Sequence, residues 1–121
     1  MNYTLTIKKN RILKCILKKG KYFASKYIVV HYMNNSEDIS KNFLGICVSK
    51  KNGISVHRNK LKRWAREIYK NEEQFLKRGK SIIILFKKTT TINNVDFYII
   101  KNDIVKCFKE LDLYEKNKEI F

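Results

Sequence analysis

The amino-acid sequence predicts an α/β sandwich in which a mixed four-stranded sheet is packed with helices. Segments with the apolar period of helices alternate with short runs of β-branched and aromatic residues. The sequence has no proline and only four glycines, so few elements are interrupted. With 121 residues and no linker or repeat, the chain fits a single domain over residues 1–121. The expected order is helix, strand, strand, a further strand or loop, helix, strand, helix.

The first expected elements are a basic helix and two strands. The helix spans Asn10–Lys19, with its first residue as the cap and Gly20 placed to end it. Residues rich in β-branched and aromatic side chains predict strands at Tyr27–Met33 and Phe43–Ser49. Because only a polar turn, residues 34–38, separates these strands, we expect them to pair antiparallel.

The second half of the chain is expected to add two helices and a buried strand. A basic, glycine-containing loop, Lys50–His57, leads into a helix from about Arg58 to Leu76. The run Ser81–Phe86 is apolar on both faces, which is typical of a strand covered on both sides. After a loop rich in Thr and Asn, Asn94 can cap a last helix over about Val95–Tyr114.

The charge of the chain is large and unevenly distributed. Twenty-seven Lys and Arg residues against eleven Asp and Glu residues leave a net charge of +16. No acidic residue occurs before Glu37 or between Ile39 and Arg66, and each of these two stretches carries eight basic residues. Such a surplus repels itself unless a polyanion is near, so the segregation predicts a nucleic-acid-binding face. A lysine-rich composition inherited from the genome is the alternative explanation of the total.

The most informative segment is residues 50–67, KKNGISVHRNKLKRWARE. On a helix, one side is apolar and can pack on the sheet, whereas Arg58, Lys62 and Arg66 lie one turn apart on the opposite half. The apolar side consists of Leu61, Trp64, Ala65 and Ile68. Successive turns rise about 5.4 Å, a spacing that suits successive phosphates.

The residue types in this segment also favour nucleic-acid binding. Only five of the 27 basic residues are Arg, and three of those five fall within nine positions here. A guanidinium group binds phosphate oxygens bidentately, and an asparagine amide can meet a base edge or a 2′-hydroxyl. A solvated helix face is the alternative, but such faces usually mix charges. The candidate contacts are Lys50, Lys51, Arg58, Asn59, Lys60, Lys62, Arg63 and Arg66.

The run LGICVSKKNGISVHRNKLKRWARE resembles the signature region of the bacterial ribonuclease P protein family. There, a strand ending in Val-Ser-Lys-Lys leads through a glycine-containing loop into a helix reading Arg-Asn-Arg-x-(Lys/Arg)-Arg-x-x-Arg. The first helix, the Ile-rich strand and the closing helix are similar too, so the resemblance covers nearly the whole chain. Lys60 stands where the family prefers Arg, which keeps the charge and loses the bidentate geometry. The resemblance implies a left-handed βαβ crossover like that of translation-machinery domains.

The resemblance also implies a function. The protein would be a subunit of ribonuclease P, an endoribonuclease whose catalyst is a large RNA, and would help that RNA to remove the 5′ leader of precursor tRNA. The expected partners are the catalytic RNA and precursor tRNA, with Mg²⁺ bound together with the RNA. We expect no catalytic residue and no metal ligand in this chain alone.

In the family, a cleft between the first helix and the sheet receives the 5′ leader as a single strand. At the matching positions this chain has Leu13 and Leu17 where relatives usually carry Phe, and His31 where they often carry Tyr. Base stacking would then be weaker, or would be supplied by His31, Tyr27 or Phe86. The alternative for His31 is a strand residue that simply faces solvent or core.

Two other function classes compete with this one. A protein-only ribonuclease needs an acid, a base and an anion stabiliser, and only His31, His57 and nearby lysines offer them. No carboxylate pair is placed for a two-metal site. A general nucleic-acid-binding module, such as a ribosomal or RNA-chaperone protein, remains as the alternative because charge alone does not exclude it.

The remaining features indicate the compartment. Cys15, Cys47 and Cys107 are far apart in apolar sequence, which predicts reduced thiols and neither a disulfide nor a zinc site. No segment has the length of a membrane span or the pattern of a secretory signal. We therefore expect a cytoplasmic protein with no membrane contact and no protein partner.

Overall fold

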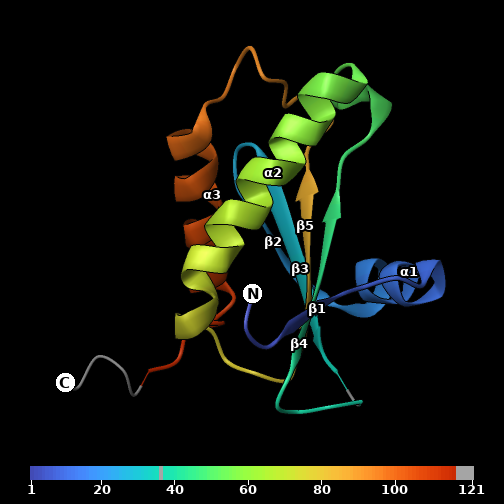
Figure 1. The fold of residues 1–121 in the computed structure, drawn as a ribbon, viewed down its shortest axis with the longest axis vertical. Coiled ribbons are helices and arrows are strands. Elements are labelled where there is room, and N and C mark those ends of the chain that lie inside the picture. Colours follow the sequence, from blue (N-terminus) through green and yellow to red (C-terminus); the bar gives the residue numbers. More distant parts are fainter. Residues whose placement is uncertain (36, 117–121) are drawn as a thin grey trace.

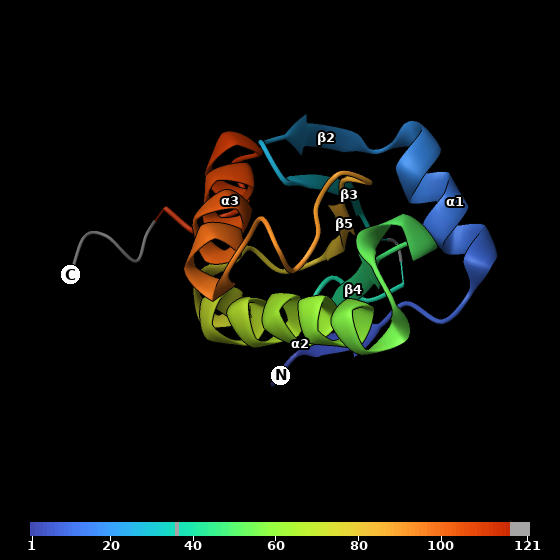
Figure 2. The same ribbon diagram turned by 90° about the horizontal axis from the view of Figure 1, so that it is seen from above.

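Two helices cover one face of a five-stranded sheet, and a third helix crosses the other face (Figures 1 and 2). The computed structural model describes residues 1–35 and 37–116. Two single turns of 3₁₀ helix, η1 (Lys50–Asn52) and η2 (Glu73–Phe75), flank the longest helix. The other elements are β1 (Thr4–Thr6), α1 (Asn10–Lys19), β2 (Lys21–Ala24), β3 (Ile28–Asn34), β4 (Asn42–Cys47), α2 (Ser55–Glu72), β5 (Lys80–Phe86) and α3 (Phe97–Glu110).

The strand order of the sheet is β1-β4-β5-β3-β2. β4 pairs parallel with both β1 and β5, whereas β3 pairs antiparallel with β5 and β2. The expected pairing of the second and third predicted segments is therefore wrong, because β5 lies between β3 and β4. The sheet also has five strands where four were expected, since β1 and β2 are short and mostly exposed.

The central position of β5 confirms that this strand is covered on both sides. Ile82 and Ile84 face α2 and α3, and Ile83 between them faces α1; all three are fully buried. β4, α2 and β5 form a parallel βαβ unit. When the sheet is viewed from the face that carries α2, with β4 and β5 both pointing up, β5 lies to the left of β4. The crossover is therefore left-handed, as the resemblance implies (Figures 1 and 2).

The ends of α1 differ in part from those expected. Lys9 occupies the cap position without a side-chain hydrogen bond, so Asn10 is the first helical residue and not the cap. Gly20 does end the helix, but with an extended backbone. A Cβ atom at Gly20 would lie 2.6 Å from the Ile16 carbonyl oxygen and 2.7 Å from that of Tyr32. Only glycine therefore lets the chain turn so tightly from α1 into β2.

The other two helices also begin at other residues than expected. α2 begins at Ser55, three residues before the expected start, because part of the predicted loop is helical. α3 is capped by Asp96, whose side chain accepts the Ile99 N–H at 2.8 Å. Asn94, the expected cap, instead orders the preceding loop: its amide accepts the Thr91 N–H and donates to the Thr89 carbonyl.

A buried carboxylate fixes the C-terminal end of α2 to β1. Glu73 is 3% exposed, and its side chain accepts hydrogen bonds from the Asn2 N–H at 2.8 Å, the Tyr3 N–H at 3.3 Å and the Thr4 hydroxyl. The Thr4 hydroxyl also contacts the Tyr69 hydroxyl at 2.8 Å. Burial raises the pKa of Glu73, but these hydrogen bonds outweigh it and the pKa lies below its ordinary value of 4.5. The charged carboxylate therefore holds the first strand and α2 together.

Replacing this carboxylate tests its contribution to the fold. We expect Glu73→Gln to lower the free energy of unfolding at pH 7 by about 1.5–3 kcal/mol, because hydrogen bonds to a charged acceptor are lost. Since the folded-state pKa lies below 4.5, this stabilisation is complete above pH 4.5 and is lost as pH falls through the folded-state pKa. Urea denaturation at several pH values measures both effects. Glu67→Gln, an exposed change on α2, should alter stability by less than about 0.5 kcal/mol. Equal stability of Glu73→Gln and the parent protein would contradict the role of the network.

Candidate nucleic-acid interface

The N-terminal two-thirds of α2 carries a continuous set of polar and cationic side chains, here called the α2 strip. The strip consists of Arg58, Asn59, Lys60, Lys62, Arg63 and Arg66. Asn59, Lys60, Arg63 and Arg66 are exposed, whereas Arg58 and Lys62 are half-buried. The structure therefore brings these predicted residues together on one helix and leaves most of them open to solvent.

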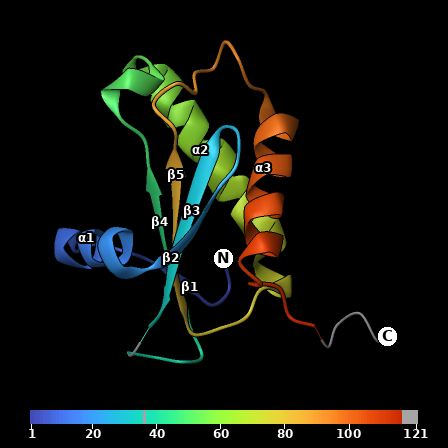
Figure 3. The same cartoon turned by 180° about the vertical axis from the view of Figure 1, so that it is seen from behind.

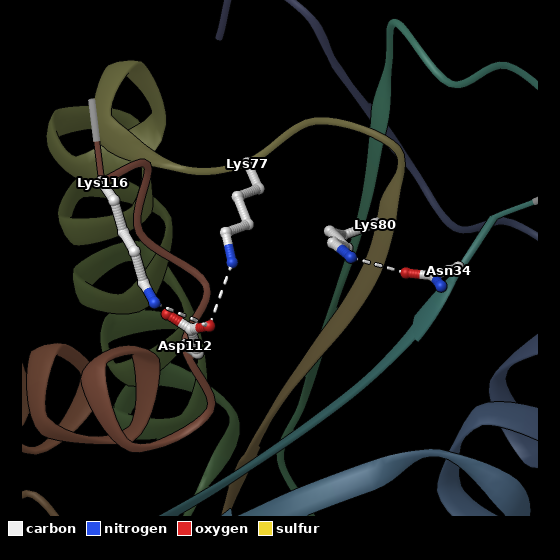
Figure 4. Close-up of polar contacts among 5 residues, drawn as sticks. All are labelled: Asn34, Lys77, Lys80, Asp112 and Lys116. Atoms are coloured by element: carbon white, nitrogen blue, oxygen red, sulfur yellow. Dashed lines mark hydrogen bonds and ion pairs between the residues drawn. The ribbon is translucent and has the colours of Figure 1, made fainter. Parts of the chain in front are cut away.

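No acidic side chain neutralises the α2 strip within the described part of the chain. The ion pairs found there lie at the other end of the molecule, where Asp112 accepts a hydrogen bond from Lys77 at 3.2 Å and forms an ion pair with Lys116 at 3.9 Å (Figure 4). The nearby Lys80 donates to an Asn34 side-chain oxygen at 2.6 Å. The charge of the strip is therefore available to a bound anion.

The position of the cationic ladder differs from the expected one. The buried face of α2 is formed by Leu61, Ala65, Ile68 and Tyr69, while Trp64 is only half-buried. Because Tyr69 and not Trp64 completes this face, the buried side is rotated toward Arg58 and Lys62. These two cations therefore lie at the edge of the core and not on the opposite half of the helix.

Packing at this edge restrains Arg58. Its Nη2 donates to the Ser55 hydroxyl at 3.0 Å, and its Nε is buried without a hydrogen-bond partner. A buried donor without a partner costs free energy, which an incoming acceptor would recover. Arg58 thus adds a restrained guanidinium group beside the more exposed Arg63 and Arg66.

The loop before α2 is ordered by a residue that the sequence reasoning missed. Asn52 is fully buried and donates to the carbonyl oxygens of Lys87 and Thr90, both at 2.7 Å. Its side-chain oxygen accepts the Ser49 N–H at 2.8 Å. The adjacent Lys50 and Lys51 are exposed on a fixed turn, and α2 begins without a side-chain cap or an acidic first turn. Both cations therefore stand beside the positive end of a helix dipole.

The face of the sheet under α1 contains three of the five predicted leader-cleft residues. Leu13 and Leu17 are half-buried against the core cluster that includes Ile83, and the register pairs His31 with Ile83 on the same face. A small cavity of about 150 Å³ is lined by Leu13, Lys62 and Arg66 among others. This cavity joins the α1 face of the sheet to the α2 strip.

The placement of Tyr27 and Phe86 in this cleft is wrong. Phe86 is 3% exposed and lies in the core between the sheet and the helices α2 and α3, and Tyr27 packs against the same core. The cause is strand alternation: Phe86 is three residues from Ile83, so the two side chains point to opposite faces. Neither ring can stack on a base bound beside α1.

The aromatic residue that does lie beside His31 is Tyr22, which the sequence reasoning missed. The register of β2 and β3 places these residues opposite each other, with ring centroids 5.4 Å apart and planes inclined by 29°. Tyr22 is 65% exposed, and burial lowers the pKa of His31, which favours the neutral imidazole. Recognition of Lys21–Ala24 as a strand antiparallel to β3 would have identified this pair.

Neither a metal-ligand cluster nor a membrane-spanning helix occurs among the described residues. No cluster of three or more His, Cys, Asp or Glu side chains suited to a metal ion occurs among residues 1–35 and 37–116. None of the helices described is long and apolar enough to span a membrane.

Comparisons with known proteins agree on one family. The family model described as ribonuclease P matches residues 1–112. The ribonuclease P protein component of Dictyoglomus turgidum is 34% identical over 111 residues, 91% of each chain, and that of Natranaerobius thermophilus is 31% identical over 117 residues, 97% of this chain and 98% of the relative. The solved Staphylococcus aureus RNase P protein is 34% identical with a TM-score of 0.81, covering 91% of this chain and 97% of that one. The Thermotoga maritima protein is 30% identical with a TM-score of 0.72, covering 84% and 92%.

The corrected position of Phe86 leads to a test by mutation. We expect Phe86→Ala to lower the free energy of unfolding by about 3–5 kcal/mol, because it removes a buried ring from the core. Tyr22→Ala removes an exposed ring and should change stability by no more than about 0.5 kcal/mol. Thermal or urea unfolding compares the two variants. A Phe86→Ala protein as stable as the parent would show that the ring lies outside the core.

Proposed function

The chain belongs to the ribonuclease P protein family, and we propose that its α2 strip binds the catalytic RNA while the α1 face of its sheet receives the precursor leader. Ribonuclease P is an endoribonuclease that matures the 5′ ends of tRNA, and the protein component works with the ribonuclease P RNA and precursor tRNA. Family membership leaves a general nucleic-acid-binding module without support.

The observation that carries the proposal is the absence of any ion pair to the α2 strip within the described residues. Solvated helices often pair opposite charges at three- or four-residue spacing. The only acid at that spacing from the strip is Glu67, four residues after Arg63, and no ion pair joins the two among the described residues. Exposed, unpaired Arg63 and Arg66 can each bind phosphate oxygens with two parallel N–H donors. Such contacts release the counterions condensed on RNA and so contribute affinity that falls with added salt.

The geometry also supports a route for the leader. The cavity lined by Leu13, Lys62 and Arg66 lies where the α1 face meets the strip, so a strand held against α1 would pass beside cations of α2. The stacked Tyr22–His31 pair offers a flat surface farther along the same face. Aromatic surfaces next to cationic grooves are how proteins hold single-stranded RNA with little dependence on sequence.

We place Mg²⁺ with the RNA and not with this chain. Mg²⁺ requires oxygen ligands in an octahedral arrangement, usually from one or two carboxylates and phosphates. The strip offers cationic groups and one amide, a donor set that does not fit a divalent cation. The chain contributes by binding and orienting the two RNAs, as one RNA-binding domain acting in the cytoplasm.

Removing one guanidinium group tests the role of the strip. Arg63→Ala and Arg66→Ala should each weaken binding to the catalytic RNA and should lower the salt dependence of log K by about one unit per lost phosphate contact. Filter binding or anisotropy at several salt concentrations measures the slope. Lys116→Ala removes an exposed cation at the other end of the molecule and should leave the slope unchanged. Parent-like slopes in both arginine variants would falsify the phosphate contacts.

A second variant tests the leader route. Leu17→Phe should bind leader-containing precursor tRNA roughly five- to tenfold more tightly, since stacking contributes about 1–3 kcal/mol per base. The affinity for mature tRNA should not change, and the ratio of the two affinities is the measurement. Val105→Phe is a control, because Val105 is also half-buried but lies on α3, which packs on the opposite face of the sheet from α1 (Figure 2). No gain for the precursor with Leu17→Phe would mean that Leu17 only packs α1 on the sheet.

A further inference from the structure

A second surface lies on the flank of α2 that faces α3. Three rings follow one another there: the centroids of Trp64 and Phe97 are 6.4 Å apart at 89°, and those of Phe97 and Tyr98 are 5.5 Å apart at 86°. Trp64 comes from α2 and the other two rings from the first turn of α3, which runs alongside α2 (Figure 3). We call these three residues the α2–α3 aromatic surface. Nothing in the proposed function uses it.

The packing of α3 on the sheet does not require the Tyr98 ring, which stays exposed. α3 packs on the sheet through Ile100, Ile104 and Phe108, all fully buried. Tyr98 is 70% exposed and lies outside the buried core, and the neighbouring Ile99 is also exposed. Trp64 and Phe97 are half-buried against the core, so the exposed part of the surface is Tyr98 with Ile99 beside it. Exposed apolar side chains that adjoin one another mark a contact surface. Its position on the helix that carries the strip indicates which partner covers it.

Cations border the aromatic surface on two sides. The Lys60 ammonium lies 5.5 Å from the centroid of the Trp64 ring, and Lys60 also belongs to the α2 strip. On α3, the exposed Lys101 follows Phe97 by one helical turn. It lines a groove between α2 and α3 that holds three lysines and two glutamates, Lys101, Lys106, Lys109, Glu72 and Glu110. Rings that can stack on bases, flanked by charges that can meet phosphates, are the features of surfaces that bind single-stranded RNA.

We propose that the α2–α3 aromatic surface is a second contact for the catalytic RNA, at which an unpaired nucleotide stacks on Tyr98 with its flanking phosphates near Lys60 and Lys101. The proposal rests on the role of the α2 strip, with which the surface is continuous through Lys60. The RNA would then contact α2 on both flanks, with the strip on one side and the aromatic surface on the other. Affinity at the strip comes from phosphate contacts, and affinity at the aromatic surface from base stacking.

The test uses the full chain and the catalytic RNA. Tyr98→Ala should weaken binding about tenfold, and Tyr98→Phe should bind like the parent because the ring is kept. The slope of log K against log salt should stay at the parent value in Tyr98→Ala, since no phosphate contact is lost. Phe75→Ala is the matched control: Phe75 is also an exposed aromatic residue, at 43%, but lies beyond the C-terminal end of α2. It should bind like the parent.

An independent readout comes from Trp64, the one tryptophan of the chain. Saturating catalytic RNA should quench its fluorescence, and Tyr98→Ala should shift the quenching curve to higher RNA concentration by the same factor as the affinity. Parent-like affinity of Tyr98→Ala, or Trp64 emission that does not respond to saturating RNA, would overturn the proposal. A reduced salt slope in Arg63→Ala together with either result would leave the α2 strip intact and reject only the aromatic surface.

Discussion

The structure depends on contacts that hold α2 in place although this helix carries a strip of cations without carboxylate partners. α2 buries Leu61, Ala65 and Ile68 against the sheet, and the strip on its remaining surface has no carboxylate partner in the described chain. Repulsion among these cations opposes the compact state, so the helix must be held by other contacts. Asn52 fixes the turn before α2 through two carbonyl groups, and Glu73 ties its last turn to β1. The anchors at both ends allow the charge between them to remain available for RNA.

The arrangement of the sheet decides which surfaces meet at α2. The left-handed β4–α2–β5 unit places α2 along the β4 side of the sheet, with α1 on the opposite face (Figures 2 and 3). The cavity lined by Leu13, Lys62 and Arg66 lies where the α1 face of the sheet meets the α2 strip. One helix therefore borders the α1 face on one flank and the aromatic surface of α3 on the other. Such a position suits a subunit that must contact a catalytic RNA and its substrate together.

Sequence reasoning found the features that depend on local pattern and missed those that depend on tertiary pairing. The basic α2 segment and the doubly covered strand Lys80–Phe86 were predictable because charge segregation and apolar runs are local signals. β2 was not predicted, since its four residues are mostly exposed and only pairing with β3 makes them a strand. The same gap hid Tyr22. Phe86 was placed on the wrong face because its alternation with Ile83 along β5 was not taken into account. The rotation of α2 that half-buries Arg58 follows from Tyr69 joining the core, which helical periodicity alone did not specify.

The claim that the cations of α2 meet RNA is tested most directly by chemical footprinting of lysine side chains. The free protein and its complex with the catalytic RNA would be acetylated briefly and compared by mass spectrometry. The account predicts strong protection of the exposed Lys60, with the exposed Lys116 as reactive in the complex as in the free protein. Equal reactivity of Lys60 in both states, at RNA concentrations that saturate binding, would contradict it.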